Sequence, residues 1–263
     1  MKAVDNRFDN VTLLITHYNR SESLKRLLDT FNDLDVGFDE IIVSDDCSRP
    51  EHLQTLQNMA VATPFQLISS EVNRGLGNNI NKGQDAVKTR YTLYVQEDFI
   101  PTRLFVQRFK NALSMMEHDE QLDIVKFYAY ISYPYLKPAN EFGFSEMYLP
   151  TFGTRYKKIY QYTDHPHLRR SSFPKKFGKY IEGIKSDKTE YYMCLSFLQN
   201  EGKGVFYNAY KELFVQKNSA DEPSTVNRKN WRNSSGFFTH VLRHTYRQIK
   251  YNYDILTKRF KVG

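Results

Sequence analysis

Glu97 and Asp98 form an acidic pair directly after YTLYVQ, a run typical of a buried strand. Two neighbouring carboxylates at a strand end destabilise the fold unless a cation neutralises them. A divalent cation that bridges a diphosphate would do so, because Mg²⁺ and Mn²⁺ bind oxygen ligands. Asp98 could instead cap a helix that starts near Pro101, so the pair alone leaves both interpretations open.

Three further polar clusters also follow apolar runs. In parallel α/β sheets, ligands bind beyond the carboxyl ends of the strands, so we expect all four clusters at one edge. A carboxylate there can accept hydrogen bonds from a base or a ribose, or it can simply cap the next turn. The three clusters are Thr16-His17-Tyr18-Asn19-Arg20, Asp45-Asp46 and Asn73-Arg74-Gly75.

The elements that position these clusters alternate along residues 10–130. Strands without polar alternation, separated by helices, predict an α/β fold with a mostly parallel sheet covered on both faces. We expect loops and short elements at 130–180, a helix at 190–198, one or two strands at 205–215 and a terminal helix at 237–256. The expected strands are 11–16, 40–44, 65–69, 91–96 and 123–128, and the expected helices are 21–31, 50–59, 78–88 and 101–117.

Composition excludes several classes of protein. The chain has 263 residues, 40% of them hydrophobic, which excludes global disorder. Its apolar runs fall far short of the roughly 20 residues that a spanning helix needs. The first ten residues lack a signal-peptide pattern, and two cysteines provide neither a disulfide framework nor a zinc site. We therefore expect a cytoplasmic protein.

The net charge of +7 is concentrated in two segments. Residues 155–179 hold eight Lys and Arg against one acid, and residues 228–263 hold nine against one. Such segments attract phosphates on nucleic acid, lipid or substrate, although a solvated surface explains them equally well. Nucleic acid is disfavoured, because the chain has no RRM or helix-turn-helix pattern.

Taken together, the motifs VTLLITHYNR, IIVSDDCS, NRGLGNNINKG and YVQEDFIP resemble the donor half of family 2 glycosyltransferases with the GT-A fold. The resemblance covers residues 10–130 and implies a nucleotide-diphospho-sugar donor, with UDP-sugar favoured, and Mn²⁺ or Mg²⁺. It places the metal at Asp98 and Glu97, with Asp98 the more direct ligand. The implied donor contacts are Thr16, Tyr18, Asn19, Arg20, Asp45, Asp46, Asn73, Arg74, Gly75, Asn81 and Gln96.

The sequence departs from the family pattern at two places. Many relatives carry Arg-Asn where this chain has Ile80-Asn81, so the missing cation would have to come from elsewhere, and Arg74 is one candidate. The acidic pair is Glu-Asp rather than the commoner Asp-Asp, which leaves direct coordination by both side chains open.

The family places its general base at the start of a helix beyond the metal motif. Glu190 resembles that residue, with Asp187 as the competitor, while a simple helix-terminal acid is the structural alternative. The run from Asp164 to Arg170 is either an acceptor- or phosphate-binding loop or plain surface.

The resemblance thus implies an inverting hexosyltransferase that acts on a saccharide or lipid-linked acceptor in surface polysaccharide or glycolipid synthesis. A non-catalytic nucleotide-sugar-binding module and a sugar nucleotidyltransferase are the alternatives. No G-x-G-x-x-G follows the first strand and no P-loop occurs, which disfavours a dehydrogenase and a P-loop NTPase. We expect a catalytic domain at 1–227, with a donor half at 10–130 and an acceptor half at 131–227.

The remaining segment, 228–263, is expected to form a basic amphipathic helix. Its cations Arg243, Arg247, Lys250 and Lys258 fall largely off an apolar stripe. The stripe either packs on the catalytic domain or contacts an anionic membrane, at the inner face of the plasma membrane. The stripe consists of Phe237, Phe238, Val241, Leu242, Tyr246, Ile249, Tyr253 and Leu256.

Overall fold

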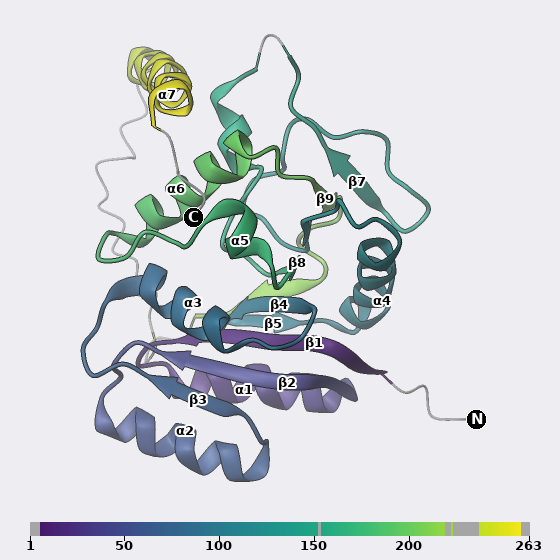
Figure 1. The fold of residues 1–263 in the computed structure, drawn as a ribbon, viewed down its shortest axis with the longest axis vertical. Helices are drawn as coiled ribbons and strands as arrows, with labels where there is room; N and C mark the ends of the chain where they lie inside the picture. Colours follow the sequence, from purple (N-terminus) through teal and green to yellow (C-terminus); the bar gives the residue numbers. More distant parts are fainter. Residues whose placement is uncertain (1–5, 152–153, 219–221, 223–236, 259–263) are drawn as a thin grey trace.

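A computed structural model describes residues 6–151, 154–218, 222 and 237–258, and side chains at 237–243 lie outside that description. One eight-stranded sheet in the order β3-β2-β1-β4-β8-β6-β9-β7 forms the centre of the molecule (Figure 1). Its strands are β1 (Asn6–His17), β2 (Val36–Asp45), β3 (Gln66–Ser69), β4 (Tyr91–Gln96), β6 (Ile124–Lys126), β7 (Phe144–Met147), β8 (His167–Arg170) and β9 (Gly204–Tyr207). A second, two-stranded sheet pairs β5 (Phe99–Pro101) with β10 (Phe214–Gln216).

Helices cover both faces of the eight-stranded sheet, as the sequence predicts for buried parallel strands. In Figure 1, α1 and α2 lie below the sheet and α3 lies above it. The helices are α1 (Ser21–Asp33), α2 (Pro50–Ala62), α3 (Gly75–Ala86), α4 (Arg103–His118), η1 (Tyr156–Tyr160), α5 (Phe173–Phe177), α6 (Ser186–Gln199) and α7 (Phe237–Thr257).

The strands β3, β2, β1 and β4 are mutually parallel, which confirms the predicted α/β class. Alternate residues of these strands point into two cores. Leu13 faces the core shared with α1 and α4, and Leu14 faces the core shared with α3 and α6. Parallel pairing brings the carboxyl ends of β1, β2 and β4 to one edge, because Thr16 lies between Ser44 and Gln96.

Gly83 lets α3 lie directly on the strands beneath it. A Cβ at this position would meet Leu14 Cδ1 at 2.5 Å and Ser44 Cβ at 3.0 Å. Such distances are far shorter than ordinary carbon contacts, so a larger residue would push α3 away from β1 and β2. The close approach seats the second half of α3 on β1 and β2.

The segment 130–180 consists of loops and short elements, as expected, but it does not simply pack against one end of the sheet. β8 runs antiparallel between β4 and β6, in the middle of the sheet. Its sequence, HLRR, contains one apolar residue and therefore gives no strand signal. Arg169 is fully buried there because the rings of Tyr94, Phe173 and Tyr180 surround its guanidinium.

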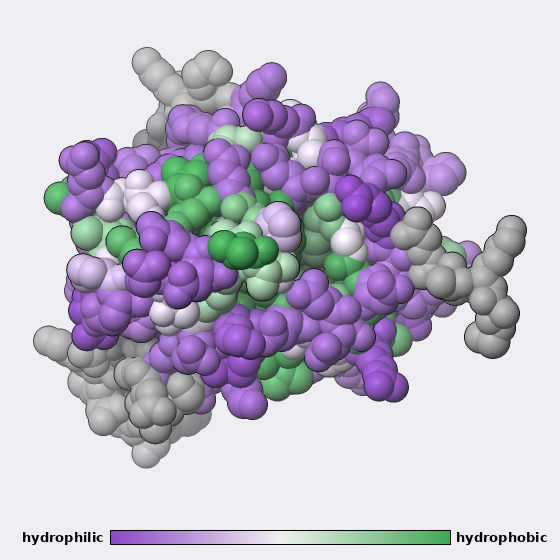
Figure 2. Space-filling view, turned by 90° about the horizontal axis from the view of Figure 1, so that it is seen from below, coloured by the Kyte–Doolittle hydropathy of each residue, from purple (hydrophilic) through white to green (hydrophobic). Residues whose placement is uncertain are grey.

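The C-terminal helix α7 packs against η1 and α6 at the top of the molecule in Figure 1. At the opposite end, where α1 and α2 lie, the surface is mostly hydrophilic with apolar side chains near its middle (Figure 2). Among the described residues, no helix combines the length and the apolar character that crossing a bilayer requires.

Candidate active site

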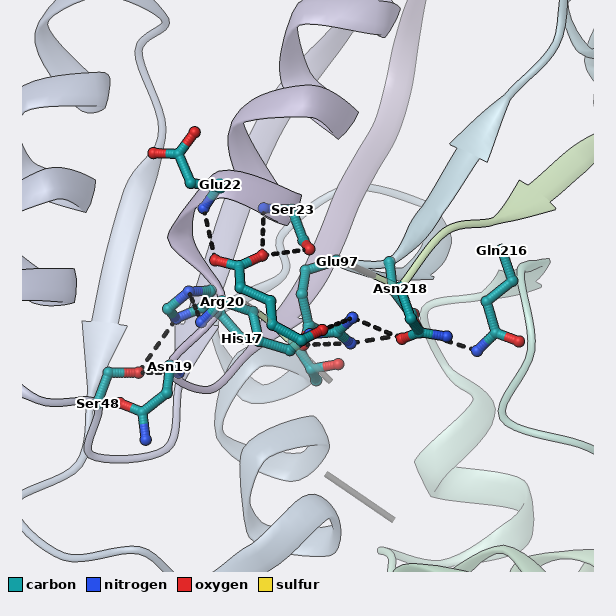
Figure 3. A network of polar contacts seen from close by, with 12 residues as sticks. His17, Asn19, Arg20, Glu22, Ser23, Ser48, Glu97, Gln216 and Asn218 are labelled. Atoms are coloured by element: carbon teal, nitrogen blue, oxygen red, sulfur yellow. Dashed lines mark hydrogen bonds and ion pairs between the residues drawn. The ribbon is translucent and has the colours of Figure 1, made fainter. Parts of the chain in front are cut away.

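Arg20 lies between the acidic pair and the chain that follows β10 (Figure 3). Its Nη1 is 3.4 Å from Glu97 Oε1 and 3.3 Å from Asp98 Oδ2, and its Nη2 donates to Asn218 Oδ1 at 2.7 Å. Gln216 Nε2 also donates to Asp98 Oδ2 at 2.8 Å. The carboxyl end of β4 is therefore an enclosed, charged site rather than a solvated turn.

The charges of this site are not fully balanced by Arg20. Burial and the neighbouring Asp98 raise the pKa of Glu97 to about 8, although Arg20 opposes the shift. An additional cation would stabilise the ionised pair, and paired carboxylates are hard-cation ligands, so the residues fit Mn²⁺ or Mg²⁺. Within the described residues, no group of three or more Asp, Glu, His or Cys side chains is arranged to hold a metal ion.

Glu222 occupies the N-terminus of α1, next to Arg20. Its carboxylate accepts hydrogen bonds from the backbone amides of Glu22 and Ser23, both at 2.9 Å, and from Ser23 Oγ at 2.5 Å. A helix N-terminus attracts anions, so this carboxylate ties the chain after β10 to the first turn of α1. The backbone carbonyl of Glu222 accepts a further bond from Arg20 at 3.3 Å.

Asp45, an expected donor contact, is fully buried beneath the edge. Its carboxylate lies 2.8 Å from His17 Nδ1 and accepts hydrogen bonds from the amide and hydroxyl of Ser48 and from Ser69 Oγ. Burial alone would raise the pKa of Asp45, but the bonds from His17 and Ser48 outweigh it and lower the pKa. Asp45 thus joins the ends of β1 and β3 to the loop after β2.

Asp46 holds the start of α3 against the end of β2. Its two carboxylate oxygens accept hydrogen bonds from the amides of Arg74 at 2.9 Å and Gly75 at 2.8 Å. Gly75 has φ +79°, a conformation that favours glycine, and Asn73 Oδ1 also accepts from its amide. The side chain of Arg74 is exposed.

Thr16 lies at the centre of the edge, where its Oγ1 is 3.1 Å from Tyr94 OH. Gln96, half-buried at the end of β4, also hydrogen-bonds the Tyr94 hydroxyl. Tyr18 and Asn19 are half-buried, and Asn19 contacts Ser48 and Arg49 through its amide and side chain. Thr16, Tyr18 and Gln96 therefore lie at the same carboxyl edge of the sheet as the acidic pair.

Asn81 joins α3 to the loop before α6. Its side chain exchanges two hydrogen bonds with the backbone of Tyr180, both at 2.9 Å, and donates to Glu182 Oε1 at 2.8 Å. The preceding Ile80 is fully buried among apolar neighbours. No cation occupies the position at which many relatives carry arginine, which leaves Arg20 as the buried cation near the acidic pair.

Glu190 and Asp187 lie on the first two turns of α6. The helix begins at Ser186, four residues before the predicted start at residue 190. Asp187 is exposed. The Glu190 carboxylate accepts a hydrogen bond from the backbone amide of Asp164, and burial together with the Asp164 charge raises its pKa. Glu190, rather than Asp187, is therefore the partly buried acid that contacts Asp164.

Contacts connect Glu190 to the donor edge. Burial raises the pKa of the Tyr94 hydroxyl most, and the charge of Asp164 raises it further. The next residue, His165, packs edge-on against Phe99, which directly follows Asp98. The structure thus brings Glu190, Asp164 and the ends of β1 and β4 to one region.

Lys126 is a buried cation that sequence reasoning missed as part of this region. Its ammonium donates to Tyr160 O at 2.7 Å, and burial lowers its pKa to about 8 while Glu190 raises it. Asp164 Oδ1 accepts a bond from Tyr162 OH, whereas its Oδ2 is buried with no partner among the described residues.

A lone lysine within the apolar run DIVKFY was the available signal for Lys126. Glu222 gave no signal, because its role depends on a tertiary contact.

Comparison with known proteins identifies the family. A family model for glycosyl transferase family 2 matches residues 12–179, and no curated protein matches the chain. Residues 1–349 of S. aureus TarS superimpose with a TM-score of 0.61 at 16% identity, covering 96% of this chain and 67% of that one. The same fragment has been solved with UDP-GlcNAc, and this chain covers 40% of a longer TarS structure.

Two other glycosyltransferase structures share the fold. The mannosyltransferase PcManGT from Pyrobaculum calidifontis, in complex with GDP-Man and Mn²⁺, gives a TM-score of 0.58 at 12% identity, covering 95% of this chain and 65% of that one. Glucosyl-3-phosphoglycerate synthase from Mycobacterium tuberculosis gives 0.52 at 15% identity, covering 80% and 72%. Because the family model covers more than half of it, the chain belongs to glycosyl transferase family 2.

Proposed function

We propose that this protein is a metal-dependent, inverting hexosyltransferase that moves a sugar from a nucleoside-diphosphate donor, UDP-sugar in preference, to an acceptor hydroxyl. The observation that carries the proposal is the chain of contacts that links the acidic pair to Glu190. The pair Glu97–Asp98 closes β4, and the Phe99–His165 contact links it to the segment that hydrogen-bonds Glu190. A donor site and a base on opposite sides of one anomeric carbon are what inversion requires.

For the donor, Asp98 and Glu97 would hold Mn²⁺ or Mg²⁺. The metal, when bound, offsets the negative charge that develops on the leaving diphosphate. Arg20 adds a fixed cation, and its Nε is buried without a partner among the described residues, so an N–H group remains for a phosphate oxygen. We assign the contacts with the base and ribose to Thr16, Tyr18, Asp46 and Gln96.

For the acceptor, Glu190 takes the proton from the attacking hydroxyl. Asp164 positions its carboxylate through the backbone amide, and Lys126 favours its ionised form. A base with a raised pKa accepts a proton more readily, which matches the demand of an alcohol that becomes a nucleophile.

Tyr130 supports a saccharide as the group that is handled. Its hydroxyl donates to Gln216 Oε1 at 2.6 Å, and Gln216 contacts Asp98, yet the Tyr130 side chain is 43% exposed. An accessible ring beside the donor site can stack on the apolar face of a sugar. We propose a saccharide or lipid-linked acceptor, in synthesis of surface polysaccharide or glycolipid.

The proposal is tested by incubating the protein with a panel of UDP- and GDP-sugars plus Mn²⁺ and measuring release of nucleoside diphosphate, with water or added saccharide as acceptor. One donor should be consumed, and both chelation and Glu190→Gln should stop its consumption. Tight, metal-dependent donor binding without release of nucleoside diphosphate from any donor would identify a non-catalytic binding module instead.

A further inference from the structure

Lys82 is a half-buried cation at the carboxyl edge of the sheet, and the donor and metal contacts described above do not use it. It lies on α3, and its Nζ donates to Asp45 O at 2.5 Å and to Ser70 Oγ at 2.6 Å. Asp45 is the last residue of β2, and Ser70 directly follows β3. The ammonium group therefore lies where these two strands end, one peptide unit from Asp46.

The charge of Lys82 is not matched by an acid in direct contact with it. Among the described residues, no carboxylate lies within ion-pair distance of its ammonium group. Burial lowers the pKa of Lys82, although the charges of Asp46 and Asp45 oppose the shift. A neutral amide side chain could donate the same two hydrogen bonds without the cost of burying a charge. The cation is therefore better suited to a ligand than to holding α3 on the sheet.

Lys82 and Asp46 both keep hydrogen-bonding capacity within the described part of the chain. An ammonium group has three N–H donors, and Lys82 uses two of them on the protein. Each carboxylate oxygen of Asp46 accepts one bond, from the amides of Arg74 and Gly75, so a lone pair is left on each. A donor and an acceptor that lie near each other without forming an ion pair can be bridged by a planar group that carries a carbonyl beside an N–H.

We propose that Lys82 selects the base of the nucleotide donor, by donating to a ring carbonyl while Asp46 accepts from the neighbouring ring N–H. Uracil presents this pair as O4 and N3–H, and guanine presents it as O6 and N1–H. Cytosine and adenine carry an amino group in place of the carbonyl and a bare ring nitrogen in place of the N–H. Lys82 would then face a donor and Asp46 an acceptor, and unpaired polar groups of this kind reject the wrong ligand. The inference rests on the proposed nucleotide-sugar donor and adds the discrimination between bases.

Isothermal titration calorimetry of the full-length protein with Mn²⁺ and four nucleotides tests the inference. The wild type should bind UDP more tightly than CDP, or GDP more tightly than ADP, and the members of each pair share the ribose and the diphosphate. Lys82→Met keeps most of the apolar stem and removes the N–H donor. It should weaken binding of the preferred nucleotide at least ~10-fold, as expected for loss of a hydrogen bond from a charged group, and leave its disfavoured counterpart nearly unchanged.

Two further variants control for effects on the fold. Lys179→Met is the matched control, because Lys179 also contacts α3, at Asp85 near the far end of the helix. It should keep the wild-type preference. If Lys82→Met lowers the melting temperature, Lys82→Gln repeats the test with a neutral donor at the edge. Its amide can turn to accept from an amino group, so the preference between the two nucleotides should still collapse.

Equal weakening of both members of a pair in the Lys82 variants would show that Lys82 only holds the edge together, and would overturn the inference. A wild type that shows no preference within either pair, or that prefers CDP or ADP, would overturn it too. In each of these cases metal-dependent nucleotide binding persists, so the proposed function stands. A wild type that binds none of the four nucleotides would refute the proposed donor site itself, and the selection of its base with it.

Discussion

Arg20 Nη1 lies 3.3 Å from Asp98 Oδ2, so the acid expected to bind metal already has a cation beside it. The same guanidinium reaches Glu97, and both acids are nearly buried. Removing one partner of a buried ion pair usually lowers the free energy of unfolding. Here Arg20 still pairs with Glu97 when Asp98 is neutralised. The fold should therefore tolerate Asp98→Asn.

Glu190→Gln should reduce sugar transfer by roughly 10²- to 10⁴-fold, the range for loss of a general base. Donor binding should be unchanged, because a base acts in the chemical step. Asp187→Asn, one turn away and exposed, is the matched control and should retain turnover. Initial rates and donor affinity for both variants check this. Loss of turnover in Asp187→Asn alone would move the base to Asp187.

The pH dependence of transfer should report Glu190. Since burial and Asp164 raise its pKa, the rate should rise with pH well above the ordinary glutamate range, as the carboxyl loses its proton. Lys126→Met removes a cation that favours the carboxylate, so this rise should move to still higher pH. Rate–pH profiles of kcat/KM measure the shift. An unmoved profile in Lys126→Met would remove Lys126 from the account.

Asn81→Ala should lower the free energy of unfolding by roughly 2–4 kcal/mol. The substitution leaves the buried amide and carbonyl of Tyr180 without their partner, and each such group costs ~1–3 kcal/mol. Asn78→Ala removes only one exposed bond to Glu182 and should cost less than ~1 kcal/mol. Urea denaturation compares the two. Equal effects would mean that the contact with Tyr180 contributes little.

Asp45→Asn should destabilise the fold at neutral pH. The lowered pKa of Asp45 means that its stabilisation is present above the unfolded-state pKa, about 3.9, and is lost as pH falls through the folded-state pKa. The wild type should therefore lose stability in acid more steeply than the variant. Unfolding free energies across pH measure both slopes. A stable variant with impaired donor affinity would instead make Asp45 a ligand contact.

The parallel half of the sheet could be predicted because each strand is a short, mainly apolar run without polar alternation, followed by a polar cluster. The strand β8 could not be predicted, because its sequence HLRR has no strand pattern and becomes a strand by pairing with β4 and β6. The early start of α3 depends on Asp46 binding two amides, which is a tertiary contact.

The sequence pointed to the acidic pair because it directly follows a strand, and the family resemblance pointed to Glu190 near the start of α6. The family resemblance singled out Asp46 for the base and ribose but kept Asp45 as a donor contact, since only the structure shows that the Asp45 carboxylate is buried among His17, Ser48 and Ser69. Arg20 was expected as a donor contact, but its pairing with Glu97 joins motifs 77 residues apart. Helical periodicity predicted the stripe on α7 without determining which side faces the domain.

The most direct test of the central claim is a thermal-shift titration with UDP and GDP, with and without Mn²⁺, on the wild type and Asp98→Asn. A nucleotide at about 100 times its Kd stabilises the folded state by about 2.7 kcal/mol, which is several degrees for a chain of this size. We predict that one nucleotide stabilises the wild type only when Mn²⁺ is present, and that Asp98→Asn melts normally but shows no such shift. Equal, Mn²⁺-dependent stabilisation of both proteins would contradict the assignment of Asp98 to the metal and the donor diphosphate.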